Sequence, residues 1–382
     1  MAPNIKDGSL GWPDLLGVRA VVFQDYDFPR RRVLWAWSDG HVCERWLPYG
    51  MPRFMWPMFT TTFYLLRINP KTGKTGDPCG TGVFIGVPSE KFPEKMAVYA
   101  VTAKHAIDKG ASIIRINAAR QLPGQAEPDI FTRPLEFEPH EWSFIPGGDD
   151  VAAIEVTSAF NRNDLIRTVP IFDLATPAVV KTLSITAGED IFMLGLFTDS
   201  PGVSFNSPCA RFGNLSQIAH PDHPIKQGHG FKHPSHITDM HSRPGFSGSP
   251  VFIYRTPDQD LVRIAGARTD KNAPTPTAFV KLLGIHSAQF KERAETAKGT
   301  KLTIPSSMAI IVPAEAVEKL LNSPRFVEAR RMRDREHTRM TRDDPQVQAE
   351  IDSTEPAADN PVHKEDFISL VSAAAKKRPQ AG

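Results

Sequence analysis

The stretch "RPGFSGSPVF", residues 243–252, places two serines in a run of small residues that leads into an apolar segment. Gly245 and Gly248 allow close backbone approach around Ser247, whose hydroxyl is the candidate nucleophile. The backbone N–H groups of Gly245 and Ser247 would form a two-donor pocket for an oxyanion. Ser249 is the weaker nucleophile candidate, because it lies at the mouth of the following strand.

A serine nucleophile needs an imidazole to take its proton and a carboxylate to orient that imidazole. In "AVYAVTAKHAID" an apolar segment ends at Ala103, and His105 follows in a short polar turn. In "GGDDVAAIEV" Asp150 directly precedes an apolar run, so it is the aspartate expected to be buried against an imidazole. Taken singly, each residue is more simply explained by a turn or a loop. Their joint order, His105, Asp150 and Ser247, predicts acyl transfer by a serine.

The segments that must position these residues are short and rich in β-forming side chains. From about residue 60, runs of Val, Ile, Phe and Tyr alternate with Gly, Pro and Asn, which is typical of a sandwich or barrel. The runs form two groups of about six, which predicts two all-β units at residues 56–175 and 176–322. The first unit contains His105 and Asp150 and the second contains Ser247. The site is therefore expected in the crevice between them.

The two ends of the chain differ from these units. Residues 1–55 show neither helical nor strand periodicity, so the sequence assigns this N-terminal extension no fold. The segment "PAEAVEKLLNS" has helical spacing and predicts a helix that closes the second unit. Residues 323–382 form a charged tail, and the acidic, apolar-poor segment 343–363 is predicted to be disordered.

The three motifs resemble those of the trypsin-like, chymotrypsin-fold serine peptidases. "VTAKHAI" resembles the TA-x-H box, "DVAAI" the Asp-apolar-Ala box and "GFSGSPV" the G-x-S-G-[GS]-P box, in the family's order over about residues 57–322. The resemblance implies two six-stranded antiparallel β-barrels with a C-terminal helix and flexible tails. It also implies a serine endopeptidase that works through an acyl-enzyme, without cofactor or metal. Ser247 is then the nucleophile, and Gly245 and Ser247 lend the oxyanion-hole N–H groups.

Further positions take expected roles from the same resemblance. "LLGIHSAQF" resembles the strand that pairs with the substrate backbone, which implies Ser287, Ala288 and Gln289 as substrate-binding residues. At the family's spacing His241 lies near the base of the primary specificity pocket. Phe246 stands where digestive members carry the aspartate that engages a freed N-terminus. The resemblance is therefore to the bacterial, non-digestive branch, without that activation switch.

The composition of the chain narrows the expected binding partners and the expected cellular compartment. A net charge of +2 argues against nucleic acid or a membrane surface as the main partner. The three cysteines are widely spaced without a CxxC, and the N-terminus has no basic region followed by an apolar one. We therefore expect a cytoplasmic protein without a disulfide framework or a zinc knuckle. Its expected partners are a protein or peptide substrate and a regulatory partner bound through the tails.

A histidine-rich stretch at residues 220–241 is a competing feature. It contains two HxxH pairs, and imidazole suits zinc, copper or nickel. Its prolines and glycines interrupt the helix or knuckle turn that a zinc site usually requires. A long polar loop beside the substrate cleft is the expected structure.

Two functions from different classes follow from the sequence. The first is an active serine endopeptidase. The second is a binding or regulatory module that carries the triad but whose peptidase activity is latent until a partner binds. The intact set of His105, Asp150 and Ser247 favours the first, because a pure binding module does not need all three.

Overall fold

The computed structural model describes most of the chain between residues 56 and 342 and three strands before it. The described ranges are 18–23, 31–37, 42–47, 56–68, 75–123, 128–202, 204–255, 279–295 and 301–342. The predicted disorder of residues 343–363 lies outside them. The chain divides into two compact units, Met1–Val327 and Glu328–Gly382, and each is described by itself.

The N-terminal extension contains a three-stranded antiparallel sheet that the sequence analysis did not predict. Its strands, in the order β1-β2-β3, are β1 (Val18–Phe23), β2 (Arg31–Trp37) and β3 (Val42–Leu47). All three are rich in Val, Leu and Trp, which favour strands. Arginines interrupt the alternation of apolar and polar residues along these strands, so the sequence shows no clear two-residue period there.

The first main group of strands forms an antiparallel sheet in the order β8-β7-β4-β5-β6-β9, and β10 adds a short parallel pairing to β5. Its strands are β4 (Thr62–Ile68), β5 (Thr75–Pro88), β6 (Met96–Thr102), β7 (Ala111–Arg120), β8 (Asp129–Leu135), β9 (Ala152–Glu155) and β10 (Val169–Pro170). Phe63, Phe84 and Trp142 are among the side chains of its own core.

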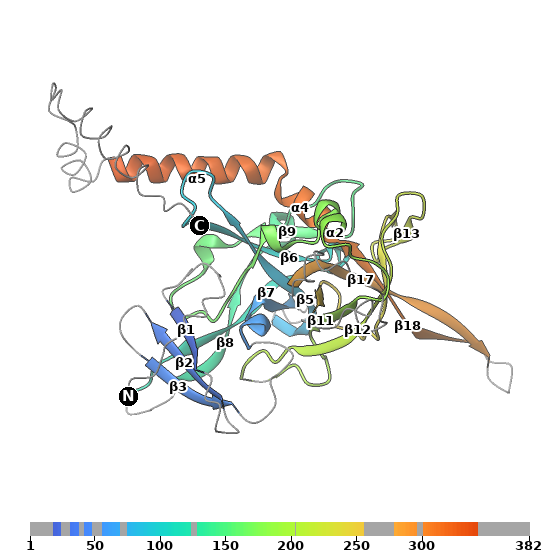
Figure 1. Cartoon of the computed structure of the whole chain (residues 1–382), viewed down its shortest axis with the longest axis horizontal. Helices are drawn as coiled ribbons and strands as arrows, with labels where there is room; N and C mark the ends of the chain where they lie inside the picture. The colour runs from blue at the N-terminus through green and yellow to red at the C-terminus, as the bar shows by residue number, and fades with distance from the viewer. Residues whose placement is uncertain are drawn as a thin grey trace, which may run out of the picture. The chain divides into compact units, whose positions relative to one another are not determined.

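The second group closes into a six-stranded barrel in the order β11-β12-β15-β18-β17-β16. Its strands are β11 (Asp190–Gly195), β12 (Cys209–Gln217), β15 (His236–Asp239), β16 (Pro250–Arg255), β17 (Phe279–Glu295) and β18 (Lys301–Pro313). The short strands β13 (Ile225–Lys226) and β14 (Lys232–His233) form a hairpin between β12 and β15. Figure 1 shows β17 and β18 continuing together beyond the barrel as a long two-stranded ribbon.

Helices are few and mostly short. The α-helices are α1 (Lys104–Asp108), α2 (Pro177–Thr182), α4 (Ala314–Leu321) and α5 (Pro324–Arg342). The 3-10 helices are η1 (Trp56–Thr61), η2 (Pro139–Glu141), η3 (Thr157–Ala159) and η4 (Ile171–Asp173). Helix α4 buries Ala316, Val317 and Leu320 on one face, as its helical spacing predicts. None of the helices in the described ranges is both long and apolar enough to cross a membrane.

A shared core joins the two main strand groups. It packs Val83 and Val101 of the first group with Phe192, Phe252 and Leu282 of the second. The rings of Phe192 and Phe252 stack with their centroids 5.0 Å apart. Because interiors of this kind are close-packed, the core holds the two groups in one relative position.

This architecture confirms the predicted fold class. The described residues are mostly β, with few helices of which only α5 is long. One strand group closes into a six-stranded antiparallel barrel, and a helix follows the last barrel strand. The arrangement is the chymotrypsin-like fold that the three motifs implied.

Two histidines are buried in the second strand group. His236 is 4% exposed and His286 is 3% exposed. Burial lowers the pKa of each imidazole to about 4, and for His286 the charge on His105 adds to this effect. The Nδ1 atom of His236 accepts a hydrogen bond from the N–H of Ala219 at 3.0 Å, so the ring is used in its neutral form. Folding therefore requires both rings to be uncharged.

Acid should destabilise the fold through these two histidines. The unfolded chain takes up their protons near pH 6.5 and the folded chain only near pH 4, so this stability is complete above pH 6.5 and is lost as the pH falls toward 4. The expected loss is about 1.4 kcal/mol of unfolding free energy per pH unit for each histidine. Urea unfolding between pH 7 and pH 5 measures it. His236→Asn should reduce the slope, whereas the exposed-site variant His223→Ala should not; equal slopes in all three proteins would contradict the assignment.

Candidate active site

His105 is held at the junction between a buried strand and a short helix. Strand β6 ends at Thr102, and His105 lies in the first turn of α1. Its backbone N–H donates to Asp150 Oδ1 at 2.8 Å, and its Nδ1 lies 2.7 Å from Asp150 Oδ2. Since an ionised carboxylate can only accept hydrogen bonds, the ring carries its proton on Nδ1 and leaves Nε2 as an acceptor.

The free nitrogen of this ring faces Ser247. His105 Nε2 lies 2.9 Å from Ser247 Oγ, although the two residues are 142 positions apart in the sequence. The serine hydroxyl donates to Nε2, since that nitrogen carries no proton. A base within hydrogen-bond reach of a hydroxyl is the geometry that general base catalysis requires.

Asp150 is fully buried, with 0% of its surface exposed. Burial alone would raise the pKa of its carboxyl group. The hydrogen bond and charge of His105, the 2.5 Å hydrogen bond from Ser287 Oγ and the backbone N–H of His105 outweigh burial, so the pKa is lowered from its ordinary value. Asp150 is therefore ionised near neutral pH and can stabilise a positive charge on His105.

The turn before Ser247 has the conformation that exposes backbone donors. Phe246 N–H donates to Arg243 O at 3.2 Å, Pro244 occupies the second position, and Gly245 occupies the third with φ +96°. This is a type II turn, whose third position favours glycine. The N–H groups of Gly245 and Ser247 donate to no acceptor in the described ranges, so both are available to an oxyanion.

Gly248 lets the nucleophile turn approach the first strand group. Its φ is +84°, and a Cβ placed there would lie 2.1 Å from both Thr102 Oγ1 and Thr81 O. Its N–H donates to His286 O at 2.9 Å. Ser249 is fully buried, and its Oγ has no hydrogen-bond partner among the residues the structure describes. The two serines of the motif are therefore in different environments, and only Ser247 meets the imidazole.

Thr81 of strand β5 connects the two strand groups at the site, and sequence reasoning missed it. Its N–H donates to Ser247 O at 2.9 Å, and its Oγ1 donates to Gly245 O at 2.8 Å. The same Oγ1 accepts a hydrogen bond from the N–H of Leu196 at 2.9 Å. One fully buried residue thus fixes the backbone on both sides of Phe246, through its side chain at Gly245 and its backbone N–H at Ser247.

The histidine-rich stretch forms a loop over the buried carboxylate. Gln227 Oε1 accepts from the N–H of Asp150 at 2.7 Å, and Gln227 Nε2 donates to Asp149 Oδ1 at 2.9 Å. The next residue, Gly228, donates its N–H to Ser287 Oγ at 2.8 Å. A Cβ on Gly228 would lie 2.7 Å from His105 Nδ1, so only glycine fits without displacing the ring. No local pattern in the sequence indicates these contacts.

The histidine side chains of this loop do not gather around a common point. The rings of His229 and His233 stack with centroids 5.6 Å apart, and His229 Nε2 lies 3.0 Å from Gly148 O. Within the described part of the chain, no group of three or more His, Cys, Asp or Glu side chains is placed to hold a metal ion.

The expected substrate-binding residues lie in two places. Ser287 is 2% exposed and its hydroxyl contacts the predicted triad through Asp150. The segment from Ser287 to Gln289 pairs with β18 on one side, while β16 pairs with β17 only as far as Ile285. His241 lines a cavity together with Phe197 and Arg211, and its expected place near the base of the primary specificity pocket stays a prediction.

Comparison with known proteins finds several solved structures that align with this chain, and the following two are among them. One, described as the atomic resolution structure of HBP, has a TM-score of 0.36 and 11% sequence identity and covers 72% of this chain and 97% of that chain. The other, human heparin binding protein, has a TM-score of 0.35 with the same identity and coverage. At this similarity neither bears on the function. No protein-family model matches the sequence, and no curated protein is found to match it.

Replacing Thr81 with valine should measure how much the hydrogen bonds of its side chain stabilise the fold. Val keeps the β-branched shape but leaves Gly245 O and Leu196 N without their partner, which costs about 1–3 kcal/mol for each buried group. We therefore expect a clear fall in the free energy of unfolding, measured by urea denaturation. The matched control is Thr238→Val in strand β15, because Thr238 Oγ1 is buried without a partner in the described residues. A Thr81 variant no less stable than this control would contradict a stabilising role for the hydrogen bonds of the Thr81 side chain.

Proposed function

We propose that the protein is a serine endopeptidase that cleaves peptide bonds through an acyl-enzyme intermediate. The observation that carries the proposal is the continuous hydrogen-bonded path from Asp150 through His105 to Ser247, with steps of 2.7 and 2.9 Å. The free N–H groups of Gly245 and Ser247 beside it supply the second requirement of acyl transfer.

Each step of the reaction has a group in position. His105 Nε2 takes the proton of Ser247 Oγ as that oxygen attacks the substrate carbonyl, and the N–H groups of Gly245 and Ser247 bind the oxyanion. Asp150 stabilises the resulting imidazolium, which then donates its proton to the leaving amine. Water enters, His105 removes its proton, and attack on the acyl group releases the carboxylic acid and restores Ser247 Oγ–H.

The open edge of β17 supports a peptide as the substrate. In the described residues no strand pairs with the segment Ser287–Gln289 on the side away from β18. An extended peptide can add there as a further strand, using backbone hydrogen bonds that do not depend on its sequence. Substrate binding by Ser287, Ala288 and Gln289 remains part of this proposal.

The conformation of the nucleophile turn favours an active enzyme over the latent binding module. The positive φ of Gly245 and the bond from Phe246 N–H to Arg243 O form the type II turn from residues of this segment alone. Phe246 is fully buried, so an aromatic side chain fills the position where digestive peptidases of the resembled family need an aspartate. This supports a turn that is formed without proteolytic activation, as in the non-digestive branch.

Labelling by a fluorophosphonate probe tests the nucleophile. We expect the wild-type protein to be labelled and Ser247→Ala to be unlabelled, since loss of such a nucleophile typically costs on the order of 10⁶ in kcat. Ser249→Ala is the matched control, and it should be labelled like the wild type because its hydroxyl contacts neither His105 nor another described donor or acceptor.

Two other outcomes have different meanings. Labelling of Ser247→Ala at the wild-type rate would refute the assignment of the nucleophile. Labelling of the wild-type protein only after addition of cell extract would favour the latent module.

Substitution of Gly228 tests the loop over the imidazole. In Gly228→Ala the new methyl group would lie 2.7 Å from His105 Nδ1 and 2.8 Å from Asp150 Oδ2, so the ring or the loop must move. Since a displacement of about 1 Å can cost 100-fold in rate, we expect the labelling rate constant to fall by about that factor. His223→Ala, at an exposed position of the same loop, should label at the wild-type rate. Equal rates for the two variants would show that the loop does not position His105.

A further inference from the structure

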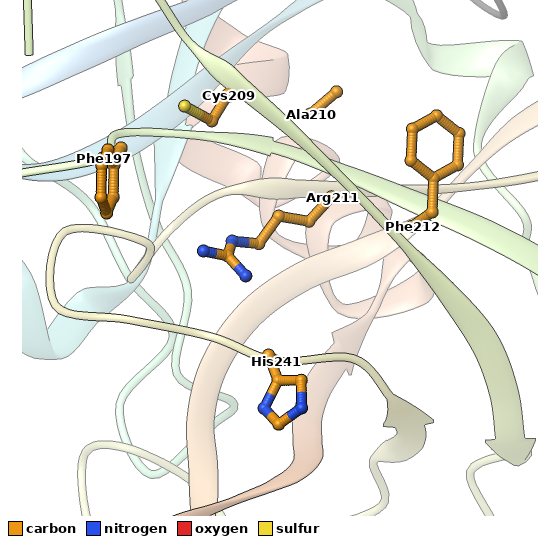
Figure 2. A pocket seen from close by; sticks show the side chains of 6 residues that line it. All are labelled: Phe197, Cys209, Ala210, Arg211, Phe212 and His241. Atoms are coloured by element: carbon orange, nitrogen blue, oxygen red, sulfur yellow. The ribbon is translucent and has the colours of Figure 1, made fainter. Parts of the chain in front are cut away.

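A cavity of about 420 Å³ lies on one side of the nucleophile turn and has no role in the proposed reaction. Its lining residues, shown in Figure 2, are Phe197, Cys209, Ala210, Arg211, Phe212 and His241. The volume is within the range of about 300–1,000 Å³ that is usual for small-molecule sites. No residue of Ser287–Gln289 lines it, although His241, which the sequence resemblance places near the base of the primary specificity pocket, does.

Among the described residues, Arg211 is the only charged side chain that lines the cavity, and none of them compensates its charge. The guanidinium lies over the ring of Phe246, 5.3 Å from the centroid. It makes no hydrogen bond or ion pair with any residue in the described ranges, and its Nε is buried without a partner. A buried donor without a partner costs free energy, so an acceptor brought by a ligand would be favourable here.

The cation–π contact of Arg211 does not occupy its N–H donors. The guanidinium carbon lies over the Phe246 ring, and no described residue accepts a hydrogen bond from the guanidinium. A guanidinium presents its N–H groups in parallel pairs along its edges. Two parallel N–H groups at such an edge match the two oxygens of a carboxylate. In Figure 2 the guanidinium end of Arg211, one of the lining residues, appears between the side chains of Phe197 and His241.

The remaining lining residues indicate which chemical groups would suit the rest of the ligand. Phe197 and Phe212 supply aromatic surface, and Cys209 and Ala210 add small apolar groups. The imidazole of His241 is the second polar group, and no acidic side chain lines the cavity. The cavity wall therefore carries one cationic group, the Arg211 guanidinium, and mainly apolar side chains surround it.

We propose that this cavity binds an organic carboxylate with an apolar body. The carboxylate pairs with the guanidinium of Arg211, and the apolar body packs against the aromatic surface of Phe197 and Phe212. The ligand is either a free organic acid or the C-terminal carboxylate of a peptide with an apolar last side chain, since both present the same chemistry to these walls.

The cavity also touches the nucleophile turn through two of its walls. Arg211 lies on Phe246, the neighbour of Ser247. Phe197 lies between Leu196 and Thr198, and a Cβ on Gly245 would lie 2.8 Å from Thr198 Cγ2. The ligand is therefore expected to bind beside the turn without blocking Ser247.

Calorimetric titration of phenylacetate into the Ser247→Ala protein tests the site without relying on activity. We expect saturable 1:1 binding, and binding about 10- to 100-fold weaker for phenylacetamide, which has the same shape without the charge. Adding Arg211→Gln should weaken phenylacetate binding by a similar factor. The matched control is Arg120→Gln, which removes an equal charge from an exposed pair with Asp129.

Other results would overturn the proposal. Equal affinity for phenylacetate and phenylacetamide, or no loss in Arg211→Gln, would exclude the carboxylate site. Should Arg211→Gln not fold, Arg211→Lys keeps the charge but not the paired donors, and unchanged affinity in that variant would exclude the bidentate contact. Acetyl-phenylalanine and a peptide ending in phenylalanine, titrated in parallel, distinguish a free acid from a peptide terminus.

The inference that the cavity is separate from the substrate site rests on the proposed function, and the rate of fluorophosphonate labelling tests it. In the wild-type protein, saturating phenylacetate should leave the fluorophosphonate labelling rate undiminished. Competitive slowing would mean that the cavity belongs to the substrate cleft and would overturn its independence. Absence of labelling under any condition would count against the peptidase alone, because the binding measurements use the Ser247→Ala protein.

Discussion

The hydrogen bond between His105 Nε2 and Ser247 Oγ, 2.9 Å long, is the contact on which the rest of the site depends. Its two residues belong to different strand groups, so it exists only while those groups keep one relative position. The shared core around Phe192 and Phe252 supplies that position, and Thr81 adds backbone hydrogen bonds at the site itself. Packing and polar contacts thus act together, because dispersion and burial hold the groups close while directional bonds set the register between them.

A buried charge is the second constraint. Asp150 is removed from water, which would be costly without compensation. His105 and Ser287 supply hydrogen bonds to its carboxylate, and Gln227 bonds its backbone N–H. The histidine-rich loop thereby gains a clear structural role, because Gln227 bonds the backbone of Asp150 and Gly228 lies beside Nδ1 of the His105 imidazole.

Close approach explains why small residues gather around Ser247. The backbone of this turn lies against strands of both groups, and Gly248 has no room for a Cβ beside Thr102. Phe246, in contrast, points into the barrel core and carries the guanidinium of Arg211 on its ring. The same turn therefore presents donors to the proposed oxyanion on one side and stabilises an uncompensated cation on the other.

Features with a local signal could be predicted from the sequence. Each of His105, Asp150 and Ser247 adjoins a recognisable apolar run or glycine turn, and the helical spacing of Ala314–Leu321 identified the closing helix. The bond of Thr81 to Gly245, 164 positions away, and that of Gln227 to Asp150, 77 positions away, arise only when the strands pack together. Local periodicity records which face of a strand is buried, but it does not record which distant strand will lie against that face. The positions of Thr81, Gln227 and Arg211 follow from the packing of two sheets, and for that reason no short pattern in the sequence revealed them.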